Sequence, residues 1–132
     1  MKKKLLVTAC IMEVGGIERS LAGMLGLIDY ERYDVDLLLF SRKGEFLPLL
    51  DSRCNLLPEI PKCASLLKPI KEVFLSGHLL MGVTRAAAKI VVTNRYKHSG
   101  ELPDAVVFAY LQAYWDSSIA LLPGLKTPYD AA

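Results

Sequence analysis

Several features that would place a protein in a class at once are missing from this 132-residue sequence. It has no stretch approaching the ~18 consecutive apolar residues of a membrane-spanning helix. Its 16 Lys and Arg residues are scattered and its net charge is only +2, which does not indicate a nucleic-acid-binding surface. The three cysteines, Cys10, Cys54 and Cys63, lack metal-binding or redox spacing. They predict reduced thiols in the cytoplasm, with no metal ion and no cofactor.

Two nucleotide-binding motifs are also missing. Gly15 and Gly16 are adjacent and position 18 is Glu, so the G-x-G-x-x-G spacing of a dinucleotide-binding domain is absent. The G-K-[ST] of a phosphate-binding P-loop is absent as well. The second predicted strand is followed by Ser41-Arg42-Lys43 rather than by an acidic residue. Basic residues at this place would suit only a dinucleotide with a 2′-phosphate on its ribose. An NADP-type domain is therefore a weaker alternative.

The N-terminus resembles an export signal, but its apolar core is too short. Three lysines, Lys2 to Lys4, precede an apolar run, and Val7 to Cys10 resembles a lipoprotein cleavage site. Only Leu5 to Ala9 would form the apolar core, which is shorter than the minimum of about seven residues. The sequence therefore favours a cytoplasmic location over export.

The most informative segment that is present runs from Leu5 to Ile28. It begins with an uncharged run of apolar and β-branched residues, which is typical of a strand buried on both faces. Gly15-Gly16 follows, with Glu18 in the first turn of a predicted helix, where a carboxylate suits the positive end of the helix dipole. One face of that helix is apolar: Ile17, Leu21, Met24, Leu25 and Ile28. Strand, glycine turn and helix together predict the first unit of a doubly wound α/β domain.

The rest of the chain continues this alternation, and its 52% hydrophobic content suits a sheet covered on both faces. We predict one domain, 1–132, of the α/β class, a three-layer Rossmann-like fold with a parallel sheet of about four strands in the order 3-2-1-4. The later strands are predicted at Asp34–Phe40, Asn55–Leu57 and Asp104–Tyr110. The helices are predicted at Ile17–Ile28, Glu45–Leu50, Leu66–Ser76, Leu79–Lys97 (ended by Ser99-Gly100) and Gln112–Leu122, before a polar end, Lys126–Ala132.

In such a sheet the ligand site lies outside the carboxyl ends of the strands, where the strand order reverses. For the order 3-2-1-4 this point falls between strands 1 and 4. Two segments are then expected to converge there, Met12–Arg19 and Ala109–Asp116. The glycine pair would let a phosphate or a sugar approach the backbone closely, because no Cβ intervenes. A tight turn without any ligand is the alternative.

Three segments, LLVTACIMEVGGIERSLAGML, YDVDLLLF and AYLQAYWD, resemble the N-terminal domain of family 4 glycosyltransferases of the GT-B fold. The resemblance covers the order of elements along the whole chain, and GGIERSL is its most specific part. It implies retaining transfer of a sugar from a nucleotide-sugar donor to a glycan or lipid-linked acceptor, generally without a metal. Gly15 and Gly16 would face the donor diphosphate and the acceptor, with Glu18 and Arg19 at the wall of the cleft.

The resemblance places a second set of residues, Tyr110, Gln112, Tyr114 and Asp116, at the rim of the cleft. Two of them are aromatic and would equally suit a core position. In that family a second domain holds the nucleotide and a pair of glutamates, and this chain has no such segment. We therefore expect a truncated N-terminal domain that is inactive by itself, with catalytic residues unknown. A non-catalytic α/β remnant or interaction module is the alternative.

Two further partners are expected. The predicted strand Asp104–Tyr110 would have an uncovered edge, which favours self-association, most simply as a two-fold dimer. Arg85 and Lys89, with Arg95 and Lys97 nearby, predict either a solvated basic helix face or peripheral contact with anionic lipid at the inner face of the membrane. His78 and His98 lack partners in the sequence for metal binding or catalysis, and we expect ordinary helix residues.

Overall fold

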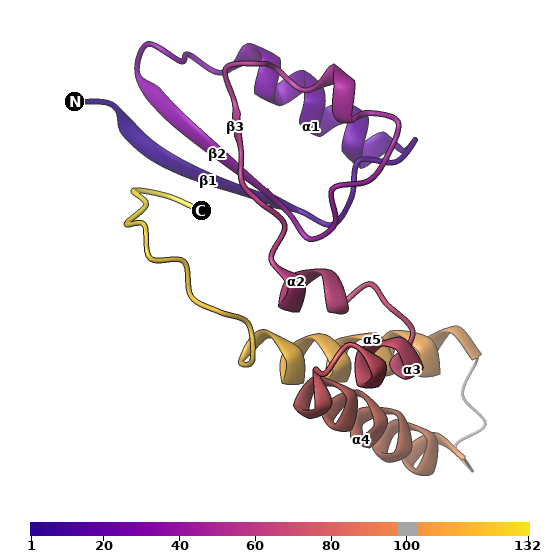
Figure 1. Cartoon of the computed structure of the whole chain (residues 1–132). Helices are drawn as coiled ribbons and strands as arrows, with labels where there is room; N and C mark the ends of the chain where they lie inside the picture. The colour runs from indigo at the N-terminus through magenta and orange to yellow at the C-terminus, as the bar shows by residue number, and fades with distance from the viewer. Residues whose placement is uncertain (98–102) are drawn as a thin grey trace. The chain divides into compact units, whose positions relative to one another are not determined.

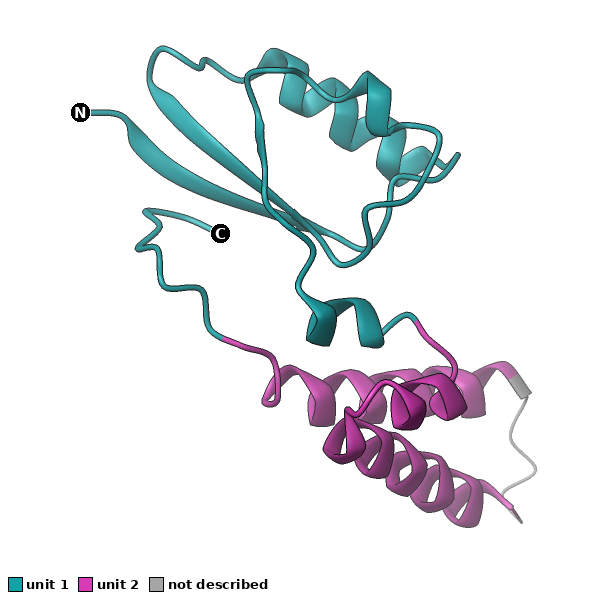
Figure 2. Ribbon diagram, viewed as in Figure 1, with its two compact units in different colours: residues 1–67, 124–132 teal, residues 68–123 magenta. Residues whose placement is uncertain are grey.

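The computed structural model describes residues 1–97 and 103–132, and His98 to Leu102, with the predicted Ser99-Gly100 stop, lie outside them. The chain divides into two compact units, residues 1–67 with 124–132 and residues 68–123 (Figure 2). The first unit contains β1 (Lys3–Ala9), α1 (Gly16–Leu27), β2 (Tyr33–Leu39), a 3-10 turn (Leu47–Leu49), β3 (Asn55–Leu56) and α2 (Pro61–Ser65) (Figure 1). The second contains α3 (Ile70–Leu75), α4 (Leu79–Tyr96) and α5 (Pro103–Ile119).

The first unit is built on a small parallel sheet in the order β1-β2-β3. Lys3 pairs with Tyr33 at one end of β1 and Ala9 pairs with Leu39 at the other, so that β1 and β2 end level with each other. The predicted helix after the glycine pair and the predicted second and third strands are confirmed to within one residue at each end. The structure is therefore mixed α/β with a parallel sheet, which is compatible with a Rossmann-like arrangement.

The core of this unit lies between α1 and one face of the sheet (Figure 1). Leu37 and Leu39 on β2 and Leu25 on α1 are completely buried, and alternate residues of β1 pack against them. The face that α1 buries differs from the predicted one, because Ile17 is 80% and Met24 is 47% exposed. The helix instead buries Leu25, with Leu21 and Ile28 packed against the same cluster.

The opposite face of the sheet carries a buried carboxylate. Asp36 on β2 is 5% exposed. It accepts a hydrogen bond from Asn55 Nδ2 at 2.7 Å and another from the Tyr129 hydroxyl at 2.7 Å. The Lys4 ammonium lies 3.8 Å from the same carboxylate. Burial of this charge is tolerated because its oxygens are satisfied from three separate parts of the chain.

The predicted fourth strand, Asp104–Tyr110, is wrong, because these residues form the first part of helix α5. The place beside β1 is taken instead by the end of the chain. The Asp130 amide donates to the Lys4 carbonyl at 2.8 Å and the Leu6 amide donates to the Ala131 carbonyl at 2.9 Å, forming a parallel bridge between Leu5 and Ala131. The strand edge through which we expected self-association is therefore not present at 104–110.

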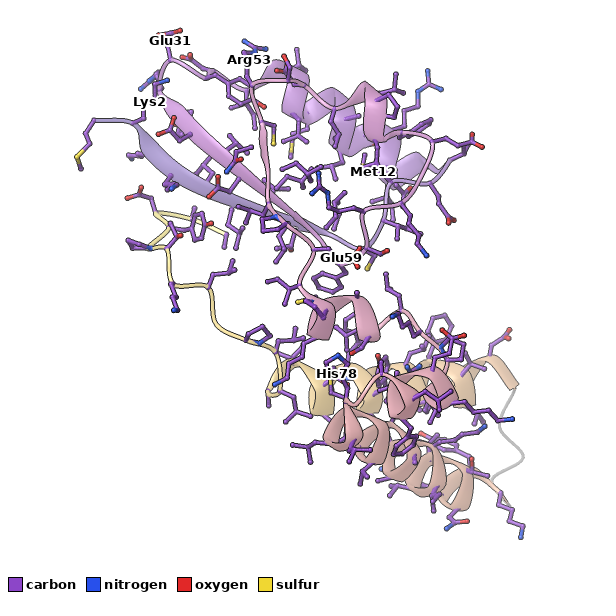
Figure 3. All side chains as sticks on the ribbon, viewed as in Figure 1. Lys2, Met12, Glu31, Arg53, Glu59 and His78 are labelled. Atoms are coloured by element: carbon purple, nitrogen blue, oxygen red, sulfur yellow. The ribbon has the colours of Figure 1, made fainter. Side chains whose placement is uncertain are left out.

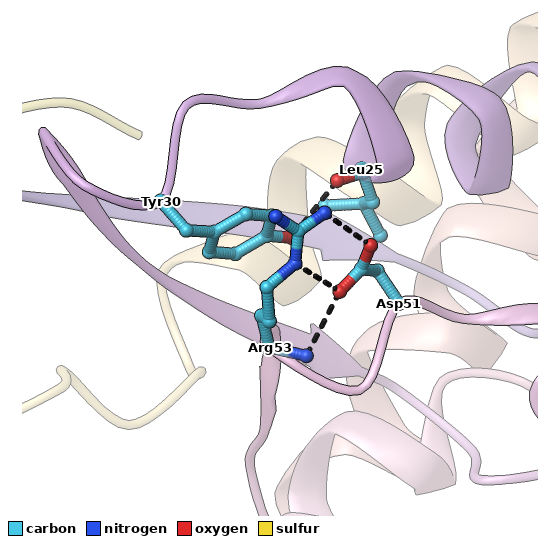
Figure 4. Close-up of polar contacts among 4 residues, drawn as sticks. All are labelled: Leu25, Tyr30, Asp51 and Arg53. Atoms are coloured by element: carbon cyan, nitrogen blue, oxygen red, sulfur yellow. Dashed lines mark hydrogen bonds and ion pairs between the residues drawn. The ribbon is translucent and has the colours of Figure 1, made fainter.

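A polar cluster ties the end of α1 to the loop before β3 (Figure 4). The Tyr30 hydroxyl donates to the Leu25 carbonyl near the end of the helix at 2.9 Å. The Arg53 guanidinium lies 4.5 Å from the Tyr30 ring and binds both carboxylate oxygens of Asp51, at 2.9 and 2.7 Å. These hydrogen bonds lower the pKa of Asp51 from its ordinary 3.8 to about 2.

The second unit is a group of three helices in which α4 packs against α3 and α5. The predicted helix Leu66–Ser76 begins later than expected, because α2 ends at Ser65 and α3 starts after Pro69. The predicted long helix from Leu79 is confirmed as α4. Arg85 on α4 lies over the Tyr114 ring at 4.3 Å and donates to the Lys68 carbonyl, so one cation connects α4, α5 and the segment before α3.

Candidate functional site

The loops that follow β1 and β2 lie against each other at the carboxyl end of the sheet. The Ser41 amide donates to the Cys10 carbonyl at 2.9 Å, and the Met12 amide donates to the Lys43 carbonyl at 2.8 Å. Met12 is completely buried beneath these loops. Figure 3 shows it at one end of the sheet, with Lys2 and Glu31 at the other. The two loops therefore form one backbone-linked platform.

Gly44 allows the two loops to approach each other closely. From the sequence, this position was only the turn after the second predicted strand. Its φ of +123° is a conformation that residues with a Cβ rarely adopt. A Cβ at this position would also lie 2.0 Å from the carbonyl carbon and oxygen of Met12. Nothing in the sequence separates Gly44 from an ordinary turn glycine, because its close contact is with a loop 32 positions earlier in the chain.

The glycine turn stands beside this platform and opens helix α1. Gly15 is the extended residue before the helix and no side chain caps it. The first helical hydrogen bond is donated by the Arg19 amide to the Gly15 carbonyl at 3.1 Å, so the amides of Gly16, Ile17 and Glu18 precede it. A Cβ on Gly16 would meet nothing within 4 Å. Packing within the chain therefore does not require glycine at position 16.

Glu18 lies across the turn. A Cβ on Gly15 would lie 2.2 Å from the Glu18 Oε2 atom, so the carboxylate covers the start of the helix. Burial raises the pKa of the Cys10 thiol at the end of β1, and the negative charge of Glu18 raises it further. Arg19, on the next residue, is exposed. The four predicted residues, Gly15, Gly16, Glu18 and Arg19, thus lie together at one helix end.

A surface hollow of about 530 Å³ lies between the two loops. It is lined by Glu13 and Val14 from the loop after β1 and by Gly44 and Glu45 from the loop after β2. Carboxylates beside an open hollow can accept hydrogen bonds from sugar hydroxyls, whereas they repel phosphates. In the part of the chain that the structure describes, no group of His, Cys, Asp and Glu side chains could hold a metal ion. Sequence reasoning placed Glu13 only within the segment Met12–Arg19 and did not place Glu45 at the site, because only the meeting of the two loops brings these residues together.

The predicted rim residues Tyr110, Gln112, Tyr114 and Asp116 lie on helix α5, in the second unit. Tyr114 is 3% exposed and its ring stacks on Tyr110, with 6.3 Å between ring centroids. Gln112 and Asp116 are exposed. Tyr114 is thus a core residue of the helical unit. The strand that was expected to carry these four residues to the glycine turn does not form, and the four residues belong to a different unit from the turn.

The glycine turn follows a strand that is paired along both of its edges. From β1 the chain passes to β2 and β3 on one side, and the Asp130–Ala131 segment lies on the other side. β1 therefore has a neighbour on each side, and it leads directly into the glycine turn. In doubly wound α/β sheets, ligands bind outside the carboxyl ends of the strands.

No known protein family, curated protein or solved structure matches this chain.

Proposed function

We propose that this chain is the acceptor-side part of a retaining glycosyltransferase of the GT-B fold, family 4. The observation that carries the proposal is the glycine turn between the carboxyl end of β1 and the start of α1. The three-layer Rossmann-like arrangement belongs to this proposal, with residues 130–131 in place of the fourth strand. The reaction would move a sugar from a nucleotide-sugar donor to a glycan or lipid-linked acceptor in the cytoplasm.

In this proposal, the amides at the start of α1 interact with the donor diphosphate, and the nearby carboxylates orient sugar hydroxyls. Exposed backbone N–H groups at a helix N-terminus attract anions. Glu18 opposes this attraction in the free chain, because its carboxylate covers Gly15. A diphosphate would displace the Glu18 side chain, which has the freedom to rotate because it is only half-buried.

The first experiment is a titration of the 132-residue protein with inorganic pyrophosphate, followed by NMR of backbone amides. We expect the Gly16 and Ile17 signals to shift most, and Glu18→Gln to tighten binding by about fivefold, since removal of one nearby like charge is worth roughly 1 kcal/mol. Gly16→Val should weaken binding while thermal melting stays nearly unchanged, because a side chain there meets open space. Shifts confined to the surface lysines, unaffected by either variant, would refute an anion site at the turn.

The second experiment measures sugar transfer. We expect no transfer by this chain alone with any nucleotide sugar, because half of a cleft cannot hold donor and acceptor together with groups that stabilise charge. Transfer by the purified chain that is lost in Gly16→Val would show that these residues suffice.

A non-catalytic interaction module remains the second candidate, and Glu18 favours it. A carboxylate beside the helix N-terminus already supplies the negative charge that the helix dipole favours, without any ligand. The two candidates predict different results for the Glu18→Gln variant. If the turn is a substrate site, the variant should bind anions more tightly. If Glu18 has only a structural role, the variant should be less stable and should bind anions no more tightly.

A further inference from the structure

Helix α4 exposes a row of apolar side chains to solvent. Helices α3 and α5 pack against α4, and Figure 1 shows both on the same side of it. On that side α4 buries Met81 and Val92. Away from that side, Leu80 is 62%, Val83 is 54% and Ile90 is 60% exposed. A helix that is apolar on two sides is normally covered on both.

The spacing of the exposed residues is typical of a helix that packs along its length on another helix. Leu80, Val83, Ala87 and Ile90 follow one another at intervals of three, four and three residues, and Asn94 comes four residues later. Alternating intervals of three and four keep side chains on one narrow stripe, as the a and d positions of packed helices do. All five residues are exposed, and we call this stripe the α4 seam.

The charged residues of α4 lie outside the α4 seam. Arg85 lies over the Tyr114 ring of α5, and Lys89 lines a groove between α4 and α5, so both belong to the side that faces their own unit. Arg95 lies about 100° round the helix from Asn94. The basic residues from which the sequence predicted one solvated or lipid-binding face therefore do not share a face.

The surroundings of the α4 seam do not favour a partner of one charge. The positions that flank it are uncharged: Leu79, Thr84, Ala86, Val91 and Thr93. The helices packed against α4 carry exposed charges of both signs, Lys71 and Glu72 on α3 and Asp104 and Asp116 on α5. In residues 1–97 and 103–132, no helix is long and apolar enough to cross a membrane. An uncharged apolar stripe is best matched by another stripe of the same kind.

We propose that the α4 seam packs against the α4 seam of a second copy of this chain, with the two helices antiparallel. A two-fold contact requires a surface that is complementary to itself, and an uncharged apolar stripe meets this requirement. In an antiparallel pair, the a positions of one helix face the d positions of the other. Leu80 then faces Ile90 of the second copy, and Val83 faces Ala87. The two-fold axis repeats both contacts, so every apolar residue of the seam has an apolar partner.

Charge and polarity favour the antiparallel pair over a parallel one. A parallel pair would place Arg95 and Lys97 of both copies at the same end, where like charges oppose association. The antiparallel pair separates these cations to opposite ends of the contact. It also places Asn94 level with position 76, before the other α4 begins, where its amide remains in water. The contact does not depend on any ligand at the glycine turn, which belongs to the other unit.

The first test is sedimentation equilibrium of the 132-residue protein between about 1 µM and about 1 mM. We expect monomers at the low end and dimers at the high end, because one helix from each copy makes a small interface. Ile90→Asp should weaken the dimer at least 100-fold, roughly tenfold for each of the two copies of the side chain in the contact. A monomer at every concentration, or a dimer that Ile90→Asp leaves intact, would overturn the proposal.

The second test determines the direction of the two helices. Leu80→Lys alone should weaken the dimer about as much as Ile90→Asp alone. The double variant should form a dimer at least about tenfold tighter than either single variant, because each introduced lysine then faces an introduced aspartate of the other copy. In a parallel pair the introduced like charges would face each other, so the absence of any recovery would refute the antiparallel arrangement.

The matched control is Phe108→Asp, which introduces the same charge at a 71% exposed apolar position on α5. It should leave the dimer affinity within about twofold of the original, and circular dichroism should show every variant folded. A loss equal to that of Ile90→Asp would assign the contact to another surface and refute the α4 seam.

Discussion

The two units of this chain differ in the balance between buried and exposed apolar side chains. In the first, a sheet face and a helix enclose a core in which Met12, Leu25, Leu37 and Leu39 are completely buried. In the second, α4 and α5 keep large apolar side chains in solvent, Phe108 at 71% and Val91 at 63% among them. A sheet offers one broad face that a single helix can cover, whereas α4 is apolar on two sides. The first unit thus has a closed core, although Ile17 and Leu27 on α1 remain exposed, whereas the helices of the second unit leave more of their large apolar side chains in solvent.

The largest expected difference in stability comes from truncating one apolar side chain in each unit. Leu37→Ala should destabilise the protein by about 2–5 kcal/mol, because it leaves a cavity in the central strand. Ile90→Ser should change stability by about 0.5 kcal/mol at most, because that side chain is already 60% exposed. Urea unfolding followed by circular dichroism measures both. Equal losses would mean that Ile90 is buried in solution.

The next contrast concerns two glycines of the first unit. Gly44→Ala should cost about 2 kcal/mol or more, because of its positive φ and the approach of the Met12 backbone. Gly16→Ala should change stability by less than about 1 kcal/mol, because its conformation and surroundings accept a methyl group. Melting temperatures of the two variants provide the comparison, and a tolerated Gly44→Ala would contradict the packing of the two loops.

A smaller effect is expected at Arg85, which connects the helices of the second unit. Arg85→Ala should destabilise this unit by about 1 kcal/mol, because the cation over the Tyr114 ring is lost. Trp115, the only tryptophan, lies 5.7 Å from the Tyr114 ring and reports the change through its fluorescence. Arg95→Ala, at an exposed position of the same helix, is the control and should leave the unfolding curve in place.

The smallest effect is a dependence on pH at Asp51. Its pKa in the folded protein is lowered to about 2 by the hydrogen bonds from Arg53. A lowered folded pKa adds stability above the ordinary value of 3.8, and this stability is lost as the pH falls from 3.8 to about 2. Asp51→Asn should therefore lower the melting temperature at about pH 6 and make no difference near pH 2. A constant difference across this range would assign the effect to something other than the charge.

Much of the first unit was predictable because its signals are local. The uncharged run before Gly15, the helical spacing after it and the short apolar runs of β2 and β3 each lie within a short stretch of the chain. The candidate turn was found for the same reason, since a glycine pair between strand and helix is visible in sequence. Gly44 was not distinguished, because its conformation depends on a loop elsewhere in the chain.

The segment Asp104–Tyr110 shows where local signals failed. A short apolar run with valines suits a buried strand or one turn of a buried helix equally well, and periodicity alone does not separate them. Packing against α4 favours the helix. Val106, Val107 and Tyr110 line the groove beside α4, and the Tyr114 ring lies under Arg85. The same side chains would have suited the interior of a sheet, so only their contacts with α4 separate the two outcomes.

The sequence by itself determined the strand–glycine turn–helix unit and the basic character of α4, because each depends on neighbours along the chain, and a helix between two strands implied that the strands are parallel. Only the tertiary structure decided that the chain beside β1 is Asp130–Ala131, that Glu18 covers Gly15 and that α4 leaves an apolar face exposed. The physical reason is distance in sequence. The hydrogen bond from the Tyr129 hydroxyl to Asp36 joins residues 93 positions apart, and no local pattern indicates such a pair.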